Sequence, residues 1–465
     1  MTVSEEKAAG DLEAALERIK RLERVIEELQ KKVAELSKEL EAARRAGKRQ
    51  AGPFARTQVK ANPKKPGQKA GHAAVHRAIP EQIDRRLRAR LAATCECGGC
   101  IRHEEMQAQY QIDIPMPVPV KTTQFDIEIG HCMKCRKRHQ GRHPEQTSNA
   151  LGAAAVQMGP GLMGLASLLK HKYGVSYGAI SGLIDGLTGQ RFARSAYCHA
   201  DTRLAERLLG TYARMILKLK RSAVVYADET GWRVGGHPAW LWVFASDEIT
   251  VYAIEDSRSH EVIKQMLGGE FAGVLKADCF MAYDSKALAG IEHSKCLGHL
   301  IRRSREIEDD KAGKRGRAAS FSRQVTVLLR AALRLGDRRE AMSAHGLLVA
   351  RGRLEAALDR LLAGSYSDPD NAKFAKLLRK QRQRLFNFLD GPGVEATNNT
   401  AEREIRQSVI IRKTNGCNRT PTGQRNHAVL ASIIRSCFRQ QRDFIRYMLA
   451  LLRQPGPAVL DFAPS

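Results

Sequence analysis

Two short, mostly apolar runs, each followed directly by an aspartate, constrain the fold of this chain more than any other feature. The runs cover residues 223–227 and 273–277, and Asp228 and Asp278 come next. Their length and their β-branched and aromatic residues predict buried strands. Ligands collect at the carboxyl ends of strands in α/β sheets. We therefore expect both carboxylates at the strand ends of one such sheet.

A third acid, Glu402, follows a different pattern. Residues 397–401 contain the Asn and Thr side chains that begin helices, so Glu402 is expected in a helix. Three carboxylates suit a hard cation such as Mg²⁺. Two such ions roughly 3.5 to 4 Å apart activate an attacking oxygen and stabilise a leaving oxygen at phosphorus. The three acids are thus candidate ligands for phosphodiester chemistry, and without metal the pKa of at least one should rise.

Structural roles compete with this interpretation. An aspartate that ends a strand is commonly a turn or cap residue. Glu402 fits a capping box with Asn399 as N-cap, and an ion pair with Arg406. Glu229 and Glu404 each lie within two positions of a candidate acid, where the side chain should point elsewhere. The conjunction of three suitable contexts favours the site.

Three segments resemble transposases of the insertion-sequence-66 family. They are residues 228–234 (DETGWRV), 240–244 (WLWVF) and 397–403 (TNNTAER). This family is a branch of the DDE transposases, so the resemblance implies an RNase H-like catalytic fold. The family's three acids match Asp228, Asp278 and Glu402. Cys296 and His299 resemble the Cys-x-x-His stretch that follows the second acid in such enzymes.

The resemblance also implies a reaction. The three acids would hold two Mg²⁺ (or Mn²⁺) ions while water cleaves the element end. The freed 3′-hydroxyl would then attack target DNA without a covalent protein intermediate. Asn399, Arg403 and Arg406 would lie beside the metal ligands or position phosphates. The alternatives are a structure-selective nuclease on the same fold, or a DNA-binding regulator without catalysis.

The charge of the chain favours a polyanionic partner. Its 465 residues include 77 Lys and Arg against 50 Asp and Glu, a formal net charge of +27. We expect salt-dependent phosphate contacts with element ends and target DNA. The alternative is a solvated basic surface. The candidate DNA-binding residues are Lys64, Lys65, Arg302, Arg303, Arg406, Arg412 and Lys413.

Residues 1–49 carry a heptad repeat that predicts a coiled coil. β-Branched residues at one core position with Leu at the other favour a parallel dimer. We therefore expect a homodimer or higher oligomer, against the alternative of one solvated helix. Residues 50–90 follow as a basic linker rich in Pro, Gly and Lys. The repeat comprises Leu12, Ile19, Ile26, Val33 and Leu40, with Ala15, Leu22, Leu29 and Leu36 between them.

Two C-x-x-C pairs predict a zinc-ribbon-like module over residues 91–145. Paired thiolates suit a tetrahedral structural Zn²⁺. Residues 111–115 and 125–129 alternate in polarity like short strands of such a ribbon. A degenerate ribbon that folds without metal is the alternative. The candidate ligands are Cys97, Cys100, Cys132 and Cys135.

The first cysteine pair leaves its ligands open. The family's first knuckle resembles Cys-x-x-Cys-Gly-Gly, which aligns Cys97 as the second cysteine and leaves Cys95 shifted by one. The ligands are therefore either Cys95 with Cys97, or Cys97 with Cys100. His103 or His131 is a further substitute.

The remaining chain divides by pattern. Residues 150–215 are helical, either a helix-turn-helix that binds DNA or a packed helical pair. Residues 220–300 and 391–425 form the expected catalytic domain, 301–390 a helical insertion, and 426–465 a helical tail over the sheet. The expected fold is multidomain α/β. It is an RNase H-like catalytic domain with a helical insertion, plus an N-terminal coiled coil, zinc ribbon and helical DNA-binding region.

The compartment follows from what the sequence lacks. Ten cysteines are too few for a disulfide scaffold, and no signal peptide or long apolar run is visible. We expect a cytoplasmic protein without a membrane partner. Related elements often carry accessory proteins, so partners encoded by the same element are also expected.

Overall fold

The computed structural model describes residues 17–18, 20–36, 79–103, 105–269, 271–311, 318–391 and 393–453. The chain divides into two compact units, Met1–Val75 and His76–Ser465. In the first unit, residues 20–36 are helical. The predicted heptad residues Leu22, Ile26, Leu29, Val33 and Leu36 are all more than half exposed on this helix. The other heptad positions, Lys64, Lys65 and linker residues 50–78 lie outside the described residues, and self-association stays a prediction.

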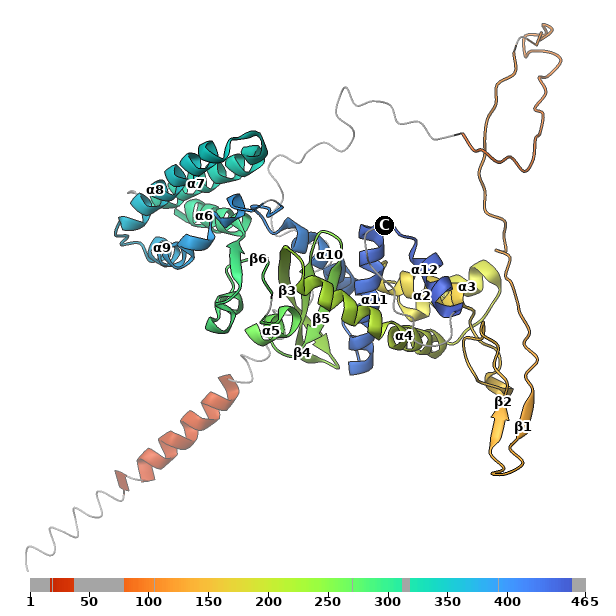
Figure 1. The fold of residues 1–465 in the computed structure, drawn as a ribbon, viewed down its shortest axis with the longest axis horizontal. Helices are drawn as coiled ribbons and strands as arrows, with labels where there is room; N and C mark the ends of the chain where they lie inside the picture. The colour runs from red at the N-terminus through yellow and green to blue at the C-terminus, as the bar shows by residue number, and fades with distance from the viewer. Residues whose placement is uncertain are drawn as a thin grey trace, which may run out of the picture. The chain divides into compact units, whose positions relative to one another are not determined.

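A mixed five-stranded sheet forms the centre of the second unit (Figure 1). The strand order is β5-β4-β3-β6-β7. β3 pairs antiparallel with β4 and parallel with β6. The strands are β3 (Val224–Val234), β4 (His237–Ala245), β5 (Thr250–Glu255), β6 (Val274–Ala277) and β7 (Glu292–Lys295).

Both predicted apolar runs form central strands, and alternation along them fills a core on each face. Val225 and Ala227 face one core, whereas Val224 and Tyr226 face the other. This period of two is that of a strand buried on both sides. Gly235 and Gly236 join β3 to β4 with φ of 57° and 86°, the positive values that a two-residue hairpin turn requires.

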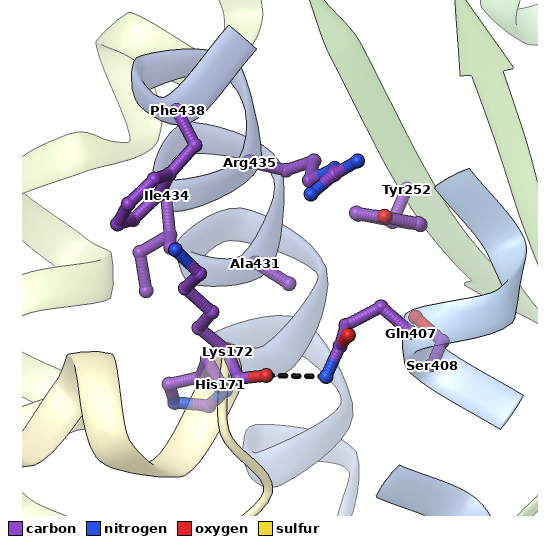
Figure 2. Close-up of a pocket in the computed structure, with 9 residues that line it drawn as sticks. All are labelled: His171, Lys172, Tyr252, Gln407, Ser408, Ala431, Ile434, Arg435 and Phe438. Atoms are coloured by element: carbon purple, nitrogen blue, oxygen red, sulfur yellow. Dashed lines mark hydrogen bonds between the residues drawn. The ribbon is translucent and has the colours of Figure 1, made fainter. Parts of the chain in front are cut away.

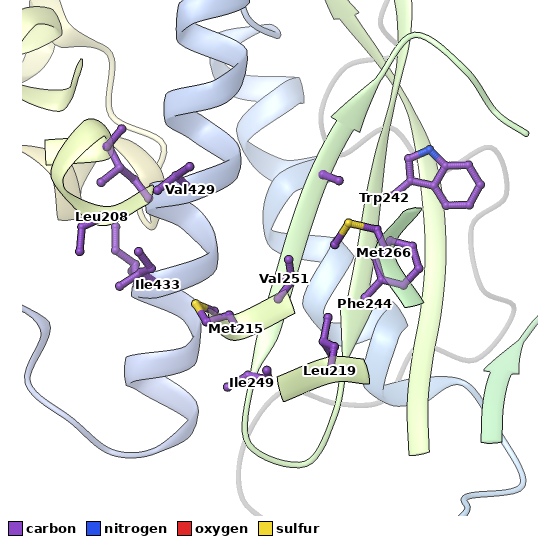
Figure 3. Packing of buried hydrophobic residues seen from close by; sticks show 14 of the residues in the cluster. Leu208, Met215, Leu219, Trp242, Phe244, Ile249, Val251, Met266, Val429 and Ile433 are labelled. Atoms are coloured by element: carbon purple, nitrogen blue, oxygen red, sulfur yellow. The ribbon is translucent and has the colours of Figure 1, made fainter. Parts of the chain in front are cut away.

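Helices cover both faces of the sheet. On the first face, α4 (Arg194–Lys220), α5 (His260–Leu267) and α11 (Pro421–Arg439) contribute to one apolar core. Figure 3 shows Met215 and Leu219 of α4 among side chains of β4 and β5. On the second face, α10 (Asn399–Asn415) contributes Ala401 and Ile405.

The edge strand β5 is closed by α11 rather than left open. The Thr250 backbone N–H donates to Ser436 Oγ at 2.9 Å, and that of Tyr252 donates to Ser432 Oγ at 2.8 Å. Satisfying these groups protects an edge that would otherwise pair with another chain. The predicted domain boundary at 425/426 therefore falls inside α11, a helix that packs against the sheet.

The helical region before the sheet shares its core. Residues 172–176 separate α2 (Pro160–His171) from α3 (Tyr177–Thr188). A single 3₁₀ turn, η1 (Gly152–Ala154), precedes them. Helix α12 (Phe444–Arg453) packs on α2. Because these helices, α4 and the sheet contribute to one core, residues 150–215 are not separate from the sheet.

Helices α6 to α9 lie between β7 and α10, where the sequence predicts a helical insertion. Its helix α6 begins at Leu297, so the predicted boundary at 300/301 cuts the first turn. Short 3₁₀ turns lie before, within and after these helices: η2 (Met281–Asp284), η3 (Lys286–Leu288), η4 (Arg339–Ala341), η5 (Arg382–Arg384) and η6 (Asn387–Leu389). The helices are α6 (Leu297–Lys311), α7 (Ala318–Arg338), α8 (Ala344–Ala363) and α9 (Pro369–Gln381).

The two strands predicted for the zinc ribbon are largely wrong. Residues 111–115 form no strand, and only Ile129 of 125–129 enters one. The hairpin instead pairs β1 (Ile129–His131) with β2 (Arg138–Gln140). The alternating polarity of residues 111–115 indicated a strand. No described neighbouring segment, however, forms strand hydrogen bonds with these residues. No described helix is long and apolar enough to cross a membrane.

A buried ion cluster fastens the insertion to the sheet. Asp284 lies 2.9 Å from Lys295, 2.9 Å from Lys380 and 3.0 Å from Arg384. The side chains of Asp284 and Lys295 are 2% and 0% exposed. Gln381 of α9 also donates to Asp284. These contacts join η2, β7 and the end of the insertion.

Removing the central acid of this cluster should loosen the insertion. Asp284→Ala leaves the Lys295 ammonium buried without its carboxylate, a change that typically costs about 3–5 kcal/mol. Asp359→Ala is the control, because its ion pair with Arg382 is exposed to solvent and screened, so losing it should change stability little. Urea unfolding measures both. Equal destabilisation of the two variants would contradict an anchoring role.

Candidate active site

Asp228 and Asp278 lie side by side where two parallel strands separate. Asp278 directly follows β6, as predicted. Asp228 does not end its strand, because β3 continues to Val234 in the hairpin with β4. However, the β3–β6 ladder stops at Tyr226, paired with Lys276. Asp228 therefore lies just past the end of the parallel ladder, which brings the two acids to the same edge.

Glu402 occupies the first turn of α10. The N-cap is Asn398, so the prediction of Asn399 as N-cap is wrong. The Asn398 side chain does not cap the helix but donates to the Ala227 carbonyl at 2.8 Å. Its backbone N–H donates to Cys296 Sγ at 3.1 Å. The start of α10 is thereby tied to the residue before Asp228.

The competing structural roles of Glu402 do not form. The expected capping box needs Asn399 as the cap, and that position is already inside the helix. Among the described residues, Glu402 lies within ion-pair distance of His299, at 3.5 Å, and not of Arg406. Its side chain is 34% exposed. The carboxylate is therefore not committed to the helix itself.

Glu229 and Glu404 have structural partners, as their positions predicted. Arg258 donates to Glu229 at 2.7 Å, and Tyr283 Oη donates to it at 2.8 Å. Glu404 is paired with Arg435. Both carboxylates are buried and occupied, so neither competes with Asp228 or Glu402 as a site residue.

The two aspartates are prepared to accept a cation. Asp228 Oδ1 accepts the Glu229 N–H at 2.9 Å, and Asp278 Oδ1 accepts the Phe280 N–H at 2.8 Å. Within the described part of the chain, Oδ2 of each accepts no hydrogen bond. Burial first, and then the charges of Glu229 and Asp278, raise the pKa of Asp228 to about 7. The expected rise is confirmed, although burial is its largest cause.

Cys296 and His299 lie beside the third acid. Hydrogen bonding to Cys296 raises the pKa of His299 to about 9, against the opposing effect of burial. Burial raises the pKa of Cys296, but hydrogen bonds with His299 more than offset it and leave the pKa lowered. The nearest ligand atoms of Cys296, His299 and Glu402 all lie within 4.8 Å of one another. Asp228, Asp278 and Glu402 do not form such a group within the described residues.

The predicted cationic residues differ in availability. Arg302 and Arg303 are exposed on α6, and Arg406 and Lys413 are exposed on α10. Arg412 instead donates to Thr230 Oγ1 at 2.9 Å and to the Gly231 carbonyl, so its guanidinium braces β3. Helix α3 contains no Lys or Arg and carries Asp185. It therefore offers no cation of its own to DNA.

The cysteines near the hairpin form local pairs. Hydrogen bonds from Cys97 lower the pKa of the Cys95 thiol, and those from Cys135 and Lys134 lower the pKa of Cys132. The choice between Cys95 with Cys97 and Cys97 with Cys100 as the first ligand pair stays a prediction. The two pairs do not come together as a metal-binding group in the described residues. His103 and His131 are exposed, and a four-cysteine zinc site stays a prediction.

Figure 2 shows a pocket that lies away from the acids. It is lined by residues of α2, α10, α11 and β5, among them Lys172, Tyr252 and Arg435. Gln407 of α10 donates to the Lys172 carbonyl across it. None of the three candidate acids lines this space. It is a packing gap between helices rather than the candidate site.

Sequence reasoning missed the residues that hold the site together. Asn398 was seen only as part of a capping segment, and the Arg258–Glu229–Tyr283 group was not predicted. One signal was available for Asn398: two adjacent asparagines exceed what a single cap needs. No local pattern links Arg258 or Tyr283 to Glu229, because their contacts join distant segments.

A strand pair that presents two aspartates beside a helical glutamate defines a candidate metal-dependent phosphoryl-transfer site. The sequence model of the Transposase IS66 family matches residues 155–426, which is more than half of the chain. The chain belongs to this transposase family. It is also similar to "Uncharacterized protein y4qI" of Sinorhizobium fredii (strain NBRC 101917 / NGR234), with 26% identity over 275 residues. That alignment covers 52% of this chain and 50% of the relative, so the chain spans about half the length of that protein.

The Asn398 bond to β3 should be measurable in stability. Asn398→Ala leaves the Ala227 carbonyl buried without its side-chain donor, which costs about 1–3 kcal/mol. Asn399→Ala is the matched control, since Asn399 is exposed inside the same turn. Chemical denaturation compares the two. Destabilisation confined to Asn399→Ala would show that Asn399, and not the contact of Asn398 with β3, fastens α10.

Proposed function

We propose that this protein is a DDE-type DNA transposase that cleaves insertion-sequence ends and joins them to target DNA. The observation that carries this proposal is the placement of Asp228 and Asp278 at one sheet edge, with α10 holding Glu402 beside them. Membership of the IS66 family supports the reaction class. The strand order, with three antiparallel strands followed by two parallel ones, supports an RNase H-like fold for this domain.

The residues fit a pair of Mg²⁺ or Mn²⁺ ions. All three side chains supply oxygen, the donor that these cations prefer. Each aspartate keeps one carboxylate oxygen without a hydrogen bond within the described residues, and Glu402 is partly exposed. When bound, such ions activate the attacking oxygen and stabilise the leaving one. Asp228, Asp278 and Glu402 are the residues that would hold these ions.

The remaining residues hold these acids in place. Arg258 and Tyr283 keep Glu229 turned away from the site, so that Asp228 alone projects there from this part of β3. Arg412 braces the strand just beyond Asp228 through Thr230 and Gly231. A supporting shell of this kind limits the ligand movement that would otherwise weaken catalysis.

DNA phosphates would be held by exposed cations near the site. Arg302 and Arg303 lie in the first turns of α6, directly after His299, and Arg406 lies one turn after Glu402. We assign element ends and target DNA to this surface. The N-terminal heptads would assemble two or more chains, and the cysteine pairs would hold a structural Zn²⁺ in a ribbon. Accessory proteins of the same element remain part of this proposal.

The alternatives predict different products. A structure-selective nuclease on this fold would cleave DNA and join nothing, and a regulator would bind without cleaving. Membership of a transposase family favours joining. The occupied roles of Glu229 and Glu404 leave the three candidate acids as the carboxylates available at this edge. The first observation favours the transposase over the nuclease, and the second favours an enzyme over a regulator.

Removing one metal ligand should abolish chemistry while leaving binding. Asp228→Asn and Glu402→Gln should each lower cleavage and joining of element-end DNA by about a thousandfold or more, since metal stabilisation supplies several kcal/mol. Glu261→Gln, an exposed acid on α5, is the control and should retain activity. Gel assays with a target plasmid and Mg²⁺ measure both steps. Normal joining by Glu402→Gln would remove Glu402 from the site, and cleavage without joining in the parent would favour the nuclease.

Phosphate binding by α6 predicts a change in salt dependence. The double variant Arg302→Ala, Arg303→Ala should reduce the slope of log affinity against log salt by about 2, roughly 0.9 for each phosphate that is no longer neutralised. Arg323→Ala is the control, because Arg323 is paired with Glu308 at 2.8 Å. Fluorescence anisotropy with duplex DNA gives the slopes. An unchanged slope in the double variant would place the DNA elsewhere.

A further inference from the structure

We propose that Cys296, His299 and Glu402 form a binding site for a borderline-soft divalent cation, Zn²⁺ in the first instance. Bound there, the cation would withhold Glu402 from the Mg²⁺-dependent reaction. The binding site stands on its own geometry. The inhibition rests on the proposed function.

Ligand geometry is the first argument. One ligand atom from each residue lies within 4.8 Å of the other two, a spacing that one ion can bridge. The donors are sulfur, nitrogen and oxygen, the three that Zn²⁺ takes in proteins, whereas Mg²⁺ prefers oxygen alone. Three protein ligands with the fourth position open to solvent is the arrangement of a zinc site that exchanges its ion.

The three ligands are fixed by backbone contacts from separate elements. Cys296 follows β7, and its N–H donates to the Ala277 carbonyl at 2.9 Å. Its sulfur accepts the Asn398 N–H at 3.1 Å, a contact that stabilises a thiolate. The Leu297 N–H donates to the Ala396 carbonyl at 3.0 Å, which holds the Cys296 loop against the start of α10. The site is therefore assembled before any ion binds.

His299 supplies the second argument. Its Nδ1 is buried and has no hydrogen-bond partner in the described residues, although it lies 3.5 Å from Glu402 Oε1. Buried polar atoms are normally hydrogen-bonded, so a buried imidazole nitrogen without a hydrogen bond, placed between a thiol and a carboxylate, is suited to bind a cation. A bound cation would satisfy it and displace the protons that these groups otherwise hold. The His299 and Glu402 side chains are about one-third exposed, which gives the ion access.

The test is zinc binding to the full chain, since other cysteines bind metal independently. After dialysis against buffered Zn²⁺, the parent should hold one more equivalent than Cys296→Ser or His299→Ala. Each variant should bind that ion more than about 100-fold more weakly, beyond the 10–100-fold effect of outer partners. Cys198→Ser, an exposed cysteine on α4, should lose none. Because His299 is partly exposed, His299→Ala tests the site even if Cys296→Ser unfolds.

Two further variants separate this site from the catalytic one. Glu402→Gln should weaken the same zinc equivalent, whereas Asp228→Asn should leave it intact. Co²⁺ should give a thiolate charge-transfer absorbance that Cys296→Ser removes. Equal zinc content in the parent, Cys296→Ser and His299→Ala overturns the proposal. Loss of the ion in Asp228→Asn also overturns it, because the ion would then belong to the aspartates.

Inhibition of DNA cleavage by Zn²⁺ is measured in a separate assay. If the chain cleaves DNA with Mg²⁺, added Zn²⁺ should inhibit the parent at least tenfold more strongly than it inhibits His299→Ala, each measured against its own zinc-free rate. Equal inhibition of both would remove the competition for Glu402 and leave the binding site. If the chain shows no DNA chemistry, the proposed function fails, while the zinc equivalents still decide the binding site.

Discussion

The pairing of β3 with different partners on its two sides is the constraint on which the rest of the site depends. Its parallel ladder with β6 ends at Tyr226, while its antiparallel ladder with β4 continues to Val234. β3 therefore stays straight and supported past Asp228, yet its β6 side is open there. The Asp228 carboxylate therefore lies on a segment of β3 that is paired with β4 but no longer paired with β6. Asp278 reaches the same opening because β6 ends directly before it.

The helices stabilise this opening rather than fill it. Asn398 bonds to Ala227, and Cys296 bonds to Ala277, so the residue before each aspartate receives a contact from a neighbouring loop. The insertion enters between those loops and is anchored through the Asp284 cluster, whose Lys295 also donates to the Asp278 carbonyl at 3.1 Å. The insertion is therefore fastened next to the second aspartate.

Local patterns predicted the parts of the structure that are encoded locally. The apolar runs around residues 224 and 274 and the helix that carries Glu402 depend on neighbouring residues. The position of Asp228 within its strand depends on β4, and the true cap residue depends on a contact with Ala227. The zinc-ribbon strands were placed wrongly because polarity alternation does not reveal whether a partner strand exists. Domain boundaries failed where α6 and α11 cross them, since both helices pack on the sheet or on loops beside it.

The central claim is that Asp228, Asp278 and Glu402 hold catalytic cations on this edge. Anomalous diffraction from crystals of the chain bound to element-end DNA and soaked with Mn²⁺ tests it most directly. The account predicts two manganese peaks that have Asp228, Asp278 and Glu402 among their ligands. Manganese located only at Cys296 and His299, or absent from the aspartates in a DNA-bound crystal, would contradict the account.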